Sequence, residues 1–385
     1  MRKHRADLTI LVLTLILMAI GLIVVYAIGP VRARFLNSLD PESNISDWYF
    51  FVKQLGSVVL GLGAFIVAYL VPYEKYRRFA RSFFWFMIGV CVVMAIAAMA
   101  GGIGPIQAVN GAYRWISLGP LGSVQPSEFL KLAMIFYLGG LLAARRREKK
   151  LDKSDTIVPV LVATILSLGL VAGAQSDMGT ALTLMGIIMM MVVGSGMKWR
   201  NVGIITGVLL LLGALFVFGG ALFGSGYRMD RVNTFLHGGS EDESHHIENA
   251  VTAIGIGGFW GVGMGNSVQA TGYLPESLND SIFAIMGETF GFVGLMLVVG
   301  LFVGLILRIL KVGEKLEDME KKLIVYGVFG WVAGHTLVNI MAMTRLVPLT
   351  GITLPLLSYG GTSILVVSAL LGVVMQFSCY TSRDV

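Results

Sequence analysis

Long apolar runs separated by short polar segments make up most of the chain, and each run is close to the length that a membrane requires. A helix needs about 20 apolar residues to cross the bilayer core. Ten segments meet this requirement, at residues 8–29, 54–71, 82–102, 126–144, 156–176, 178–197, 201–223, 281–307, 323–344 and 356–378. The pattern predicts an all-α polytopic membrane protein with about ten transmembrane helices. Only residues 175–177 separate the fifth and sixth segments, so a continuous bent helix is an alternative there.

The positions of the basic residues predict the orientation of these helices. Most of the 29 lysines and arginines lie at the N-terminus, at 75–81, 145–153, 198–200 and 308–322, and in the C-terminal tail. Cytoplasmic loops carry such an excess of basic residues, so both termini are predicted to be cytoplasmic. The same count places three segments outside, at 103–125, 224–280 and 345–360. Residues 1–385 are predicted to form a single membrane domain, with loop 224–280 as a large extracytoplasmic loop between spans seven and eight.

Composition excludes several classes of function. The chain is 56% hydrophobic and only 14% charged, with a mean hydropathy of +0.79, whereas soluble domains are about 25% charged. The net charge of +6 is explained by topology, so no nucleic acid is predicted as a partner. Cys91 and Cys379 both lie in apolar runs, which favours neither a disulfide framework nor a metal site.

Asp280 is the first candidate for chemistry, because it ends the polar segment 224–280 and directly precedes a long apolar helix. A carboxylate at this place is costly unless it is paired or used. The alternative is that Asp280 simply caps the helix. Ala284, Gly287, Gly291 and Gly294 follow at helical spacing, and such a stripe of small residues would let another helix or a lipid chain approach closely.

Several cations and acids accompany Asp280 on the predicted outer side. Glu128 and Lys131 are three residues apart at the start of the fourth span, so they share a helix face and can pair. Arg228 and Arg231 have the same spacing and suit phosphate oxygens. The alternatives are an interfacial anchor for Arg114, a helix cap for Asp177 and a lipid-headgroup contact for the Arg228 pair.

Two further patterns in the polar loop carry less specific signals. His245, His246 and Glu248 resemble metal-ligand spacing but match no firm motif, so segment 237–249 is interpreted as a solvated loop or an amphipathic interfacial stretch. The glycine-rich segment 255–265 lacks the lysine of a phosphate-binding loop and is interpreted as flexible or closely packed.

A carboxylate among cations suits a reaction on a lipid-linked phosphate. The carboxylate could act as a general base toward a sugar hydroxyl while the cations stabilise a departing pyrophosphate. Composition alone does not choose between this reaction and lipid transport.

The motifs of the outer segments resemble one family, over nearly the whole chain and in order. They are Gly111–Ile116, Gln125–Glu128 with Lys131, Asp177–Thr180, Gly272–Glu276 with Asp280–Ala284, and Thr350–Pro355 with Ser358–Ser363. This set is similar to the SEDS family of FtsW, RodA and SpoVE proteins.

The resemblance implies a ten-span peptidoglycan glycosyltransferase of the bacterial cytoplasmic membrane. It implies polymerisation of lipid II at the outer face, together with a class B penicillin-binding transpeptidase. The essential acid of the family falls on Asp280. Substrate-binding positions are implied at Arg114, Glu128, Lys131, Asp177, Arg228, Arg231, Glu276 and Ser358.

Segment 267–269 and the Gly287-Glu288 pair resemble FtsW more than RodA. This favours a role in cell division at the septum, alongside other divisome membrane proteins. Asn279, Thr289 and Ser176 depart from the residues usual in the family, and His245 and His246 stand where Tyr and Gln are expected, so no role is implied for them.

The alternatives to this function are a flippase for lipid II, an elongation polymerase of the RodA type, and a scaffold that only recruits division proteins. A divalent cation, Mg²⁺ or Mn²⁺, could bridge Asp280 and the pyrophosphate, although the sequence shows no dedicated cage.

Overall fold

The predicted apolar segments all form helices in the computed structural model, which describes residues 5–40, 44–106, 108, 112–119, 122–222, 241–272, 274 and 276–381. The helices are α1 (Leu8–Leu39), α2 (Tyr49–Leu70), α3 (Tyr73–Arg77), α4 (Ala80–Met99), α5 (Pro126–Arg147), α6 (Ser154–Leu168), η2 (Gly169–Ala174), α7 (Met178–Gly194), α8 (Trp199–Leu222), α10 (Glu241–Gly257), η3 (Gln269–Thr271), α11 (Ile282–Glu314), α12 (Met319–Met343) and α13 (Gly361–Ser378). Within the described residues, nine helical segments are long and apolar enough to cross a membrane. The remaining predicted span, α7, is shorter at 17 residues. The chain is thus a multi-pass membrane protein.

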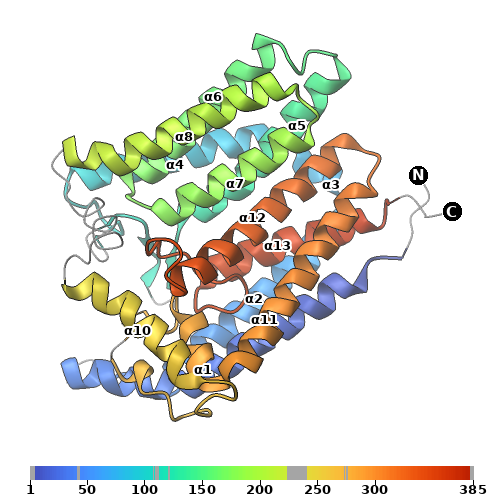
Figure 1. Cartoon of the computed structure of the whole chain (residues 1–385). Coiled ribbons are helices and arrows are strands. Elements are labelled where there is room, and N and C mark those ends of the chain that lie inside the picture. Colours follow the sequence, from blue (N-terminus) through green and yellow to red (C-terminus); the bar gives the residue numbers. More distant parts are fainter. Residues whose placement is uncertain are drawn as a thin grey trace.

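Helices α12 and α13 lie in the middle of the molecule (Figure 1). Helix α12 packs against α5, α7 and α11, while α13 packs against α2. Close approach in the second pair is possible because Gly372 of α13 faces the backbone of Phe65 on α2, which an added Cβ would approach to 2.3 Å. Small residues serve this purpose in membranes, where association depends on close van der Waals contact.

Helix α1 extends ten residues beyond its predicted end at Gly29. It continues through Pro30 to Leu39 and is 32 residues long, which corresponds to about 48 Å at the rise of an α-helix. A bilayer core is only about 30 Å thick. The additional turns therefore carry Arg32 beyond the apolar part of the helix, a placement that the sequence interpretation missed.

The predicted boundary at residues 175–177 is a break between two helices. Helix α6 continues into the π-helical turn η2 and stops at Gln175, and Ser176 adopts a positive φ of 53°. The side chain of Asp177 then caps α7 by accepting a hydrogen bond from the Thr180 N–H at 3.0 Å. The capping interpretation of Asp177 is confirmed, and the bent continuous helix is not formed.

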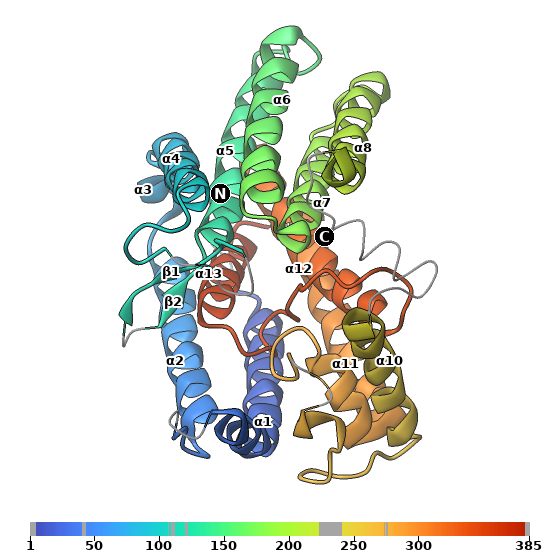
Figure 2. The same ribbon diagram turned by 90° about the vertical axis from the view of Figure 1, so that its left-hand side faces the viewer.

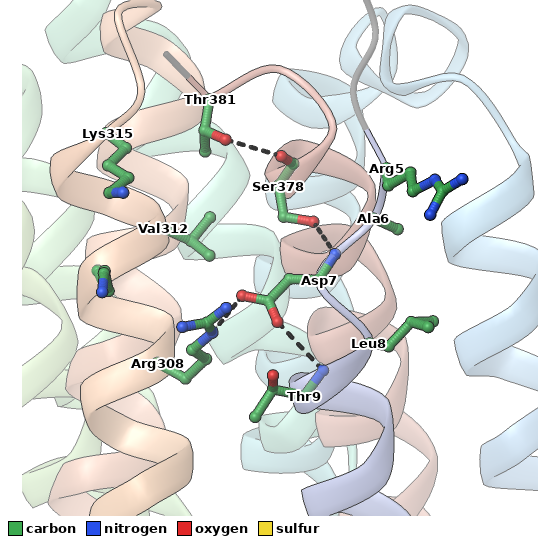
Figure 3. Close-up of a pocket in the computed structure, with 11 residues that line it drawn as sticks. Arg5, Ala6, Asp7, Leu8, Thr9, Arg308, Val312, Lys315, Ser378 and Thr381 are labelled. Atoms are coloured by element: carbon green, nitrogen blue, oxygen red, sulfur yellow. Dashed lines mark hydrogen bonds and ion pairs between the residues drawn. The ribbon is translucent and has the colours of Figure 1, made fainter. Parts of the chain in front are cut away.

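One end of the bundle is held together by ion pairs. Glu320 of α12 is buried and accepts from the Tyr73 hydroxyl at 2.6 Å and from Arg77 at 2.8 Å. Nearby, Asp7 pairs with Arg308 of α11, and its N–H donates to the Ser378 hydroxyl at 2.9 Å (Figure 3). These contacts join α1, α11 and α13 at the end where the described chain begins and finishes.

The opposite end contains the short strands, α10 and the loop 344–360 (Figure 2). Strands β1 (Ile116–Ser117) and β2 (Ser123–Val124) pair antiparallel, with Ile116 opposite Val124. Two-residue strands show no alternation of apolar and polar positions, so the sequence did not predict them.

The described residues of segment 237–249, from Glu241 onward, are helical, so the solvated-loop alternative is wrong for them. Residues from Glu241 onward belong to α10, which packs against α11 because Ile247 and Ala250 are buried. The predicted close approach at the small-residue stripe is confirmed, since a Cβ on Gly257 would lie 1.9 Å from the carbonyl oxygen of Gly287.

Helix α11 is kinked where it meets the glycine-rich segment. Gly291 has a φ of 66° inside the helix, a conformation that glycine adopts without steric cost. The backbone there bonds to the neighbouring segment instead, with Phe292 N–H donating to Gly258 O at 2.9 Å and Val262 N–H donating to Glu288 O at 2.9 Å. Of the two interpretations of residues 255–265, close packing is correct.

We expect Gly257→Ala to destabilise the protein by about 1–3 kcal/mol, because the new methyl group must push α10 away from α11. Gly255→Ala is the matched control, since a Cβ at Gly255 has no heavy atom within 4 Å and alanine favours a helix. The melting temperature in detergent should fall only for the Gly257 variant. Equal melting temperatures would show that the contact between the helices does not constrain α10.

Candidate functional site

Asp280 lies in the turn before α11 and is 8% exposed. Its carbonyl oxygen accepts a hydrogen bond from Nδ2 of Asn339, at 2.7 Å, and the same amide donates to the carbonyl oxygen of Ile352 at 2.6 Å. One buried side chain of α12 therefore fixes the backbone of Asp280 against the loop 344–360. The sequence interpretation did not single out Asn339.

Asp280 does not cap α11. The N-cap residue is Ser281, whose side chain makes no capping hydrogen bond. The hydroxyl of Ser281 instead lies 3.3 Å from Oδ1 of Asp280. The capping interpretation of Asp280 is therefore wrong, because Ser281 occupies the N-cap position.

The buried Asp280 and the half-buried Glu276 are two neighbouring acids, and Arg32 and His246 lie close to them. Burial and the charge of Asp280 raise the pKa of Glu276, while a hydrogen bond from Asn279 and the charges of Arg32 and His246 act in the opposite direction. Like charges at close range favour protonation of one of them. We refer to Arg32, His246, Glu276, Asp280 and Ser281 as the acid group.

Arg32 enters the acid group from the extended part of α1. Its Nη1 is buried and has no hydrogen-bond partner within the described part of the chain. A buried guanidinium nitrogen without a partner is costly, and it is suited to a phosphate oxygen. The signal in the sequence was the pair Arg32 and Arg34 following the first apolar run.

A second group surrounds Lys131, which is completely buried. Its Nζ lies 2.6 Å from Oε1 of Glu128, so the predicted pairing on one helix face is confirmed. The same nitrogen lies 4.2 Å from the ring centroid of Trp331 and 3.0 Å from Nε2 of His335. We call Glu128, Lys131, Trp331 and His335 the lysine group.

The hydrogen bonds of the lysine group define the tautomer of His335. Its Nδ1 lies 3.3 Å from the carbonyl oxygen of Thr353, which can only accept, so Nδ1 carries the proton. Nε2 is then an acceptor for the ammonium of Lys131, which has only donors. His335 and Trp331 were missed in the sequence, where the signal was a lone histidine within an apolar span.

Arg114 and Asp177 meet at the break between α6 and α7. The guanidinium of Arg114 donates to the carbonyl oxygens of Gln175 at 3.1 Å and Ser176 at 2.6 Å. The carboxylate of Asp177 accepts from Nε2 of Gln125 at 2.8 Å in addition to its cap. Arg114 thus holds the helix break, which is a more specific role than the interfacial anchor.

Ser358 organises the turn that leads into α13. Its hydroxyl accepts from the N–H of Leu354 at 2.8 Å, and its carbonyl oxygen accepts from Nε2 of Gln54 at 3.2 Å. Arg228 and Arg231 lie outside the described residues. Within the described part of the chain, no group of three or more His, Cys, Asp or Glu side chains could hold a metal ion.

Helix α12 joins the two groups. His335 and Asn339 are four residues apart, so they project from the same face of the helix. His335 binds the lysine group to Thr353, and Asn339 binds Asp280 to Ile352. Of the predicted site residues, Asp280 and Glu276 therefore lie in the acid group and Glu128 and Lys131 in the lysine group, whereas Arg114, Asp177 and Ser358 belong to neither.

We expect Lys131→Met to destabilise the protein by about 3–5 kcal/mol, because it leaves the buried carboxylate of Glu128 without its counter-charge. The double variant Glu128→Gln, Lys131→Met removes both charges and should recover most of this loss. Chemical or thermal unfolding in detergent measures the difference. A double variant less stable than Lys131→Met would contradict the assignment of the pair as one compensated unit.

Comparisons with known proteins identify the family of this chain. The family model for FtsW, RodA and SpoVE, described as "Cell cycle protein", matches residues 7–383. Stage V sporulation protein E of Bacillus subtilis (strain 168) is 32% identical over 99% of both chains. The probable peptidoglycan glycosyltransferase FtsW of Nitrosomonas europaea is 30% identical, over 96% of this chain and 92% of that protein.

Two solved structures share the fold. The rod shape determining protein RodA of Thermus thermophilus superimposes with a TM-score of 0.67, at 22% identity, over 98% of both chains. A chain from a peptidoglycan synthase complex superimposes with a TM-score of 0.74, at 23% identity, over 97% of both chains. With the family model matched over nearly its whole length, this chain belongs to the FtsW, RodA and SpoVE family of cell cycle proteins.

Proposed function

We propose that this protein is a peptidoglycan glycosyltransferase that polymerises lipid II at the outer face of the bacterial cytoplasmic membrane. Membership of the family and the relatives named as probable peptidoglycan glycosyltransferases support this function. The observation that carries it is the buried carboxylate of Asp280, whose backbone is fixed by Asn339 beside a second acid and an arginine.

The proposed orientation places both termini in the cytoplasm. In support, the basic segments around Arg77, Arg147 and Arg308 lie at the same end of the bundle as the described chain ends (Figure 1). Helix α10 and the loop 344–360 lie at the other end, and α10 carries His246 of the acid group. Basic residues remain on the cytoplasmic side of a membrane, so the site faces outward.

In the proposed reaction, Asp280 acts as general base. Its carboxylate takes the proton of the acceptor sugar 4-hydroxyl, whose oxygen then attacks the anomeric carbon of the donor. The bond from that carbon to undecaprenyl pyrophosphate breaks, and the leaving group departs with its electron pair. Arginine and lysine side chains stabilise the charge that develops on the pyrophosphate. Arg32 is a candidate in addition to the predicted Arg114, Lys131, Arg228 and Arg231.

The substrate-binding roles of Glu128, Asp177, Glu276 and Ser358 are part of the proposal. Glu128 pairs with Lys131 and holds it in place, and Asp177 and Ser358 shape the loops around the site. Glu276 shares the acid group with Asp280.

The described residues contain no dedicated metal cage. Asp280 and Glu276 supply two carboxylates, and they belong to no group of three or more metal-binding side chains in the described part of the chain. The proposed reaction is written with no step through a metal ion.

We propose a class B penicillin-binding transpeptidase as the partner, within a division complex at the septum. The structural neighbour from a peptidoglycan synthase complex supports such an assembly. The relatives named FtsW and the family description as cell cycle proteins support the division role. The FtsW-like segments contact each other: the Ser267 hydroxyl donates to Oε2 of Glu288 at 2.5 Å, and the Val268 N–H donates to Oε1 at 2.8 Å.

We expect Asp280→Asn to reduce polymerisation at least about 100-fold, because the amide cannot accept the hydroxyl proton. The measurement is glycan strand length formed from lipid II by the purified protein with its transpeptidase. Asp47→Asn is the control, since Asp47 is an exposed acid whose ion pair with Arg34 contributes little; its activity should stay within about twofold of the wild type.

Undiminished polymer from the Asp280 variant would remove this residue from the mechanism. The wild-type protein should polymerise lipid II in detergent, where no second leaflet exists. A flippase would form no polymer under these conditions, so this result separates the two functions. Replacement of the native copy by Asp280→Asn separates it from a scaffold, because a scaffold would still support growth at normal membrane levels.

A further inference from the structure

His246 lies within hydrogen-bond distance of the residue that contacts the candidate base. It is on the second turn of α10, and its Nε2 is 2.8 Å from the hydroxyl oxygen of Ser281. That hydroxyl is in turn 3.3 Å from Oδ1 of Asp280. Ser281 is completely buried and His246 is half-buried. The three side chains form a continuous hydrogen-bonded chain that starts on α10 and ends on the carboxylate.

The direction of this chain follows from its last member. An ionised carboxylate only accepts hydrogen bonds, so the hydroxyl of Ser281 donates to Asp280. The oxygen of Ser281 then accepts from His246, which places a proton on Nε2 of the imidazole. Through these two contacts, the side chain of Asp280 is linked to the position of α10.

We propose that His246 is a positioning residue for Asp280, acting through Ser281. This inference rests on the proposed function of Asp280 as a base. The family resemblance implied no role for His246, and this inference gives it one. The imidazole does not touch the reacting atoms; it holds the hydroxyl that orients the carboxylate toward the acceptor hydroxyl.

The surroundings of His246 support this role. Helix α10 is held against α11 by the contact of Gly257 with Gly287 and by the buried side chains of Ile247 and Ala250. The imidazole therefore reaches Ser281 from a rigid element, which positions a side chain more precisely than a loop does. The charge of His246 also acts on Glu276, in the direction that lowers the pKa of that acid.

The test compares kcat and KM for lipid II in the purified full chain with its transpeptidase. We expect His246→Ala and Ser281→Ala each to lower kcat about tenfold, the scale of a hydrogen bond to a charged group, with KM changed less than about twofold. His246→Gln should restore most of the rate, because its amide N–H can donate to Ser281. The matched control is Thr252→Ala, on an exposed position of the same helix, which should leave both parameters unchanged.

The double variant His246→Ala, Ser281→Ala provides the decisive comparison. If the residues act through one hydrogen-bonded chain, the double variant is no slower than the slower single variant. Multiplying effects, an unchanged kcat in His246→Ala, or a change confined to KM would each overturn the proposal. If His246→Ala lowers the melting temperature, His246→Met fills the space without an N–H donor and is measured in its place.

The outcome is distinguishable from failure of the proposed function. An inactive Asp280→Asn variant together with a fully active His246→Ala variant rejects only the role of His246. An active Asp280→Asn variant rejects the base itself, whatever the histidine variants do.

Discussion

The ion pair between Lys131 and Glu128 is the constraint on which the centre of the structure depends. A fully buried ammonium is tolerated only when its desolvation is offset by a counter-charge and further contacts, and here the offset comes from two helices. Glu128 is on α5 with Lys131, whereas Trp331 and His335 are on α12. Helix α12 must therefore turn the face that carries Trp331 and His335 toward α5. This rotation of α12 about its own axis decides where its other polar residues point.

The position of Asn339 follows from this rotation. It is one turn beyond His335, on the same face, and its amide holds the backbone of Asp280 and of Ile352. Asp280, the candidate base, directly precedes α11, but its backbone is held by a side chain of α12. This arrangement explains why α11 begins with Ser281 as a weak cap: the turn is held from outside by α12, so it does not need a strong cap of its own.

The apolar pattern predicted the helices well because each span is long and its length is set by the bilayer. It missed features that depend on contacts distant in sequence. The continuation of α1 past Gly29 places Arg32 in the acid group, and no local signal in the sequence marks its electrostatic interaction with Glu276. The role of Gly257 depends equally on Gly287, which the sequence separates from it by 29 positions but the fold places in contact.

In the candidate site, too, contacts within one helix could be predicted from the sequence, whereas contacts between residues distant in sequence could not. Spacing along one helix was enough to predict the pair of Glu128 and Lys131, and the cap by Asp177 was one of two readings of a local pattern. His335 was missed because its partners come from α5 and from the loop after α12. The capping interpretation of Asp280 was wrong because local propensity identifies a residue that can cap a helix, and the contact with Ser281 directs its carboxylate elsewhere.

The separation of the two groups fits the chemistry of the proposed reaction. The acceptor hydroxyl has to lose a proton, which requires a carboxylate, whereas the leaving pyrophosphate gains charge, which requires cations. A lysine bonded directly to Asp280 would lower the basicity of its carboxylate. In this structure Lys131 is bonded to Glu128 and His335, and Asp280 is contacted by a hydroxyl. Helix α12 holds the lysine group through His335 and the backbone of Asp280 through Asn339, so Lys131 is fixed in a different group from Asp280, while Arg32 is the cation within the acid group.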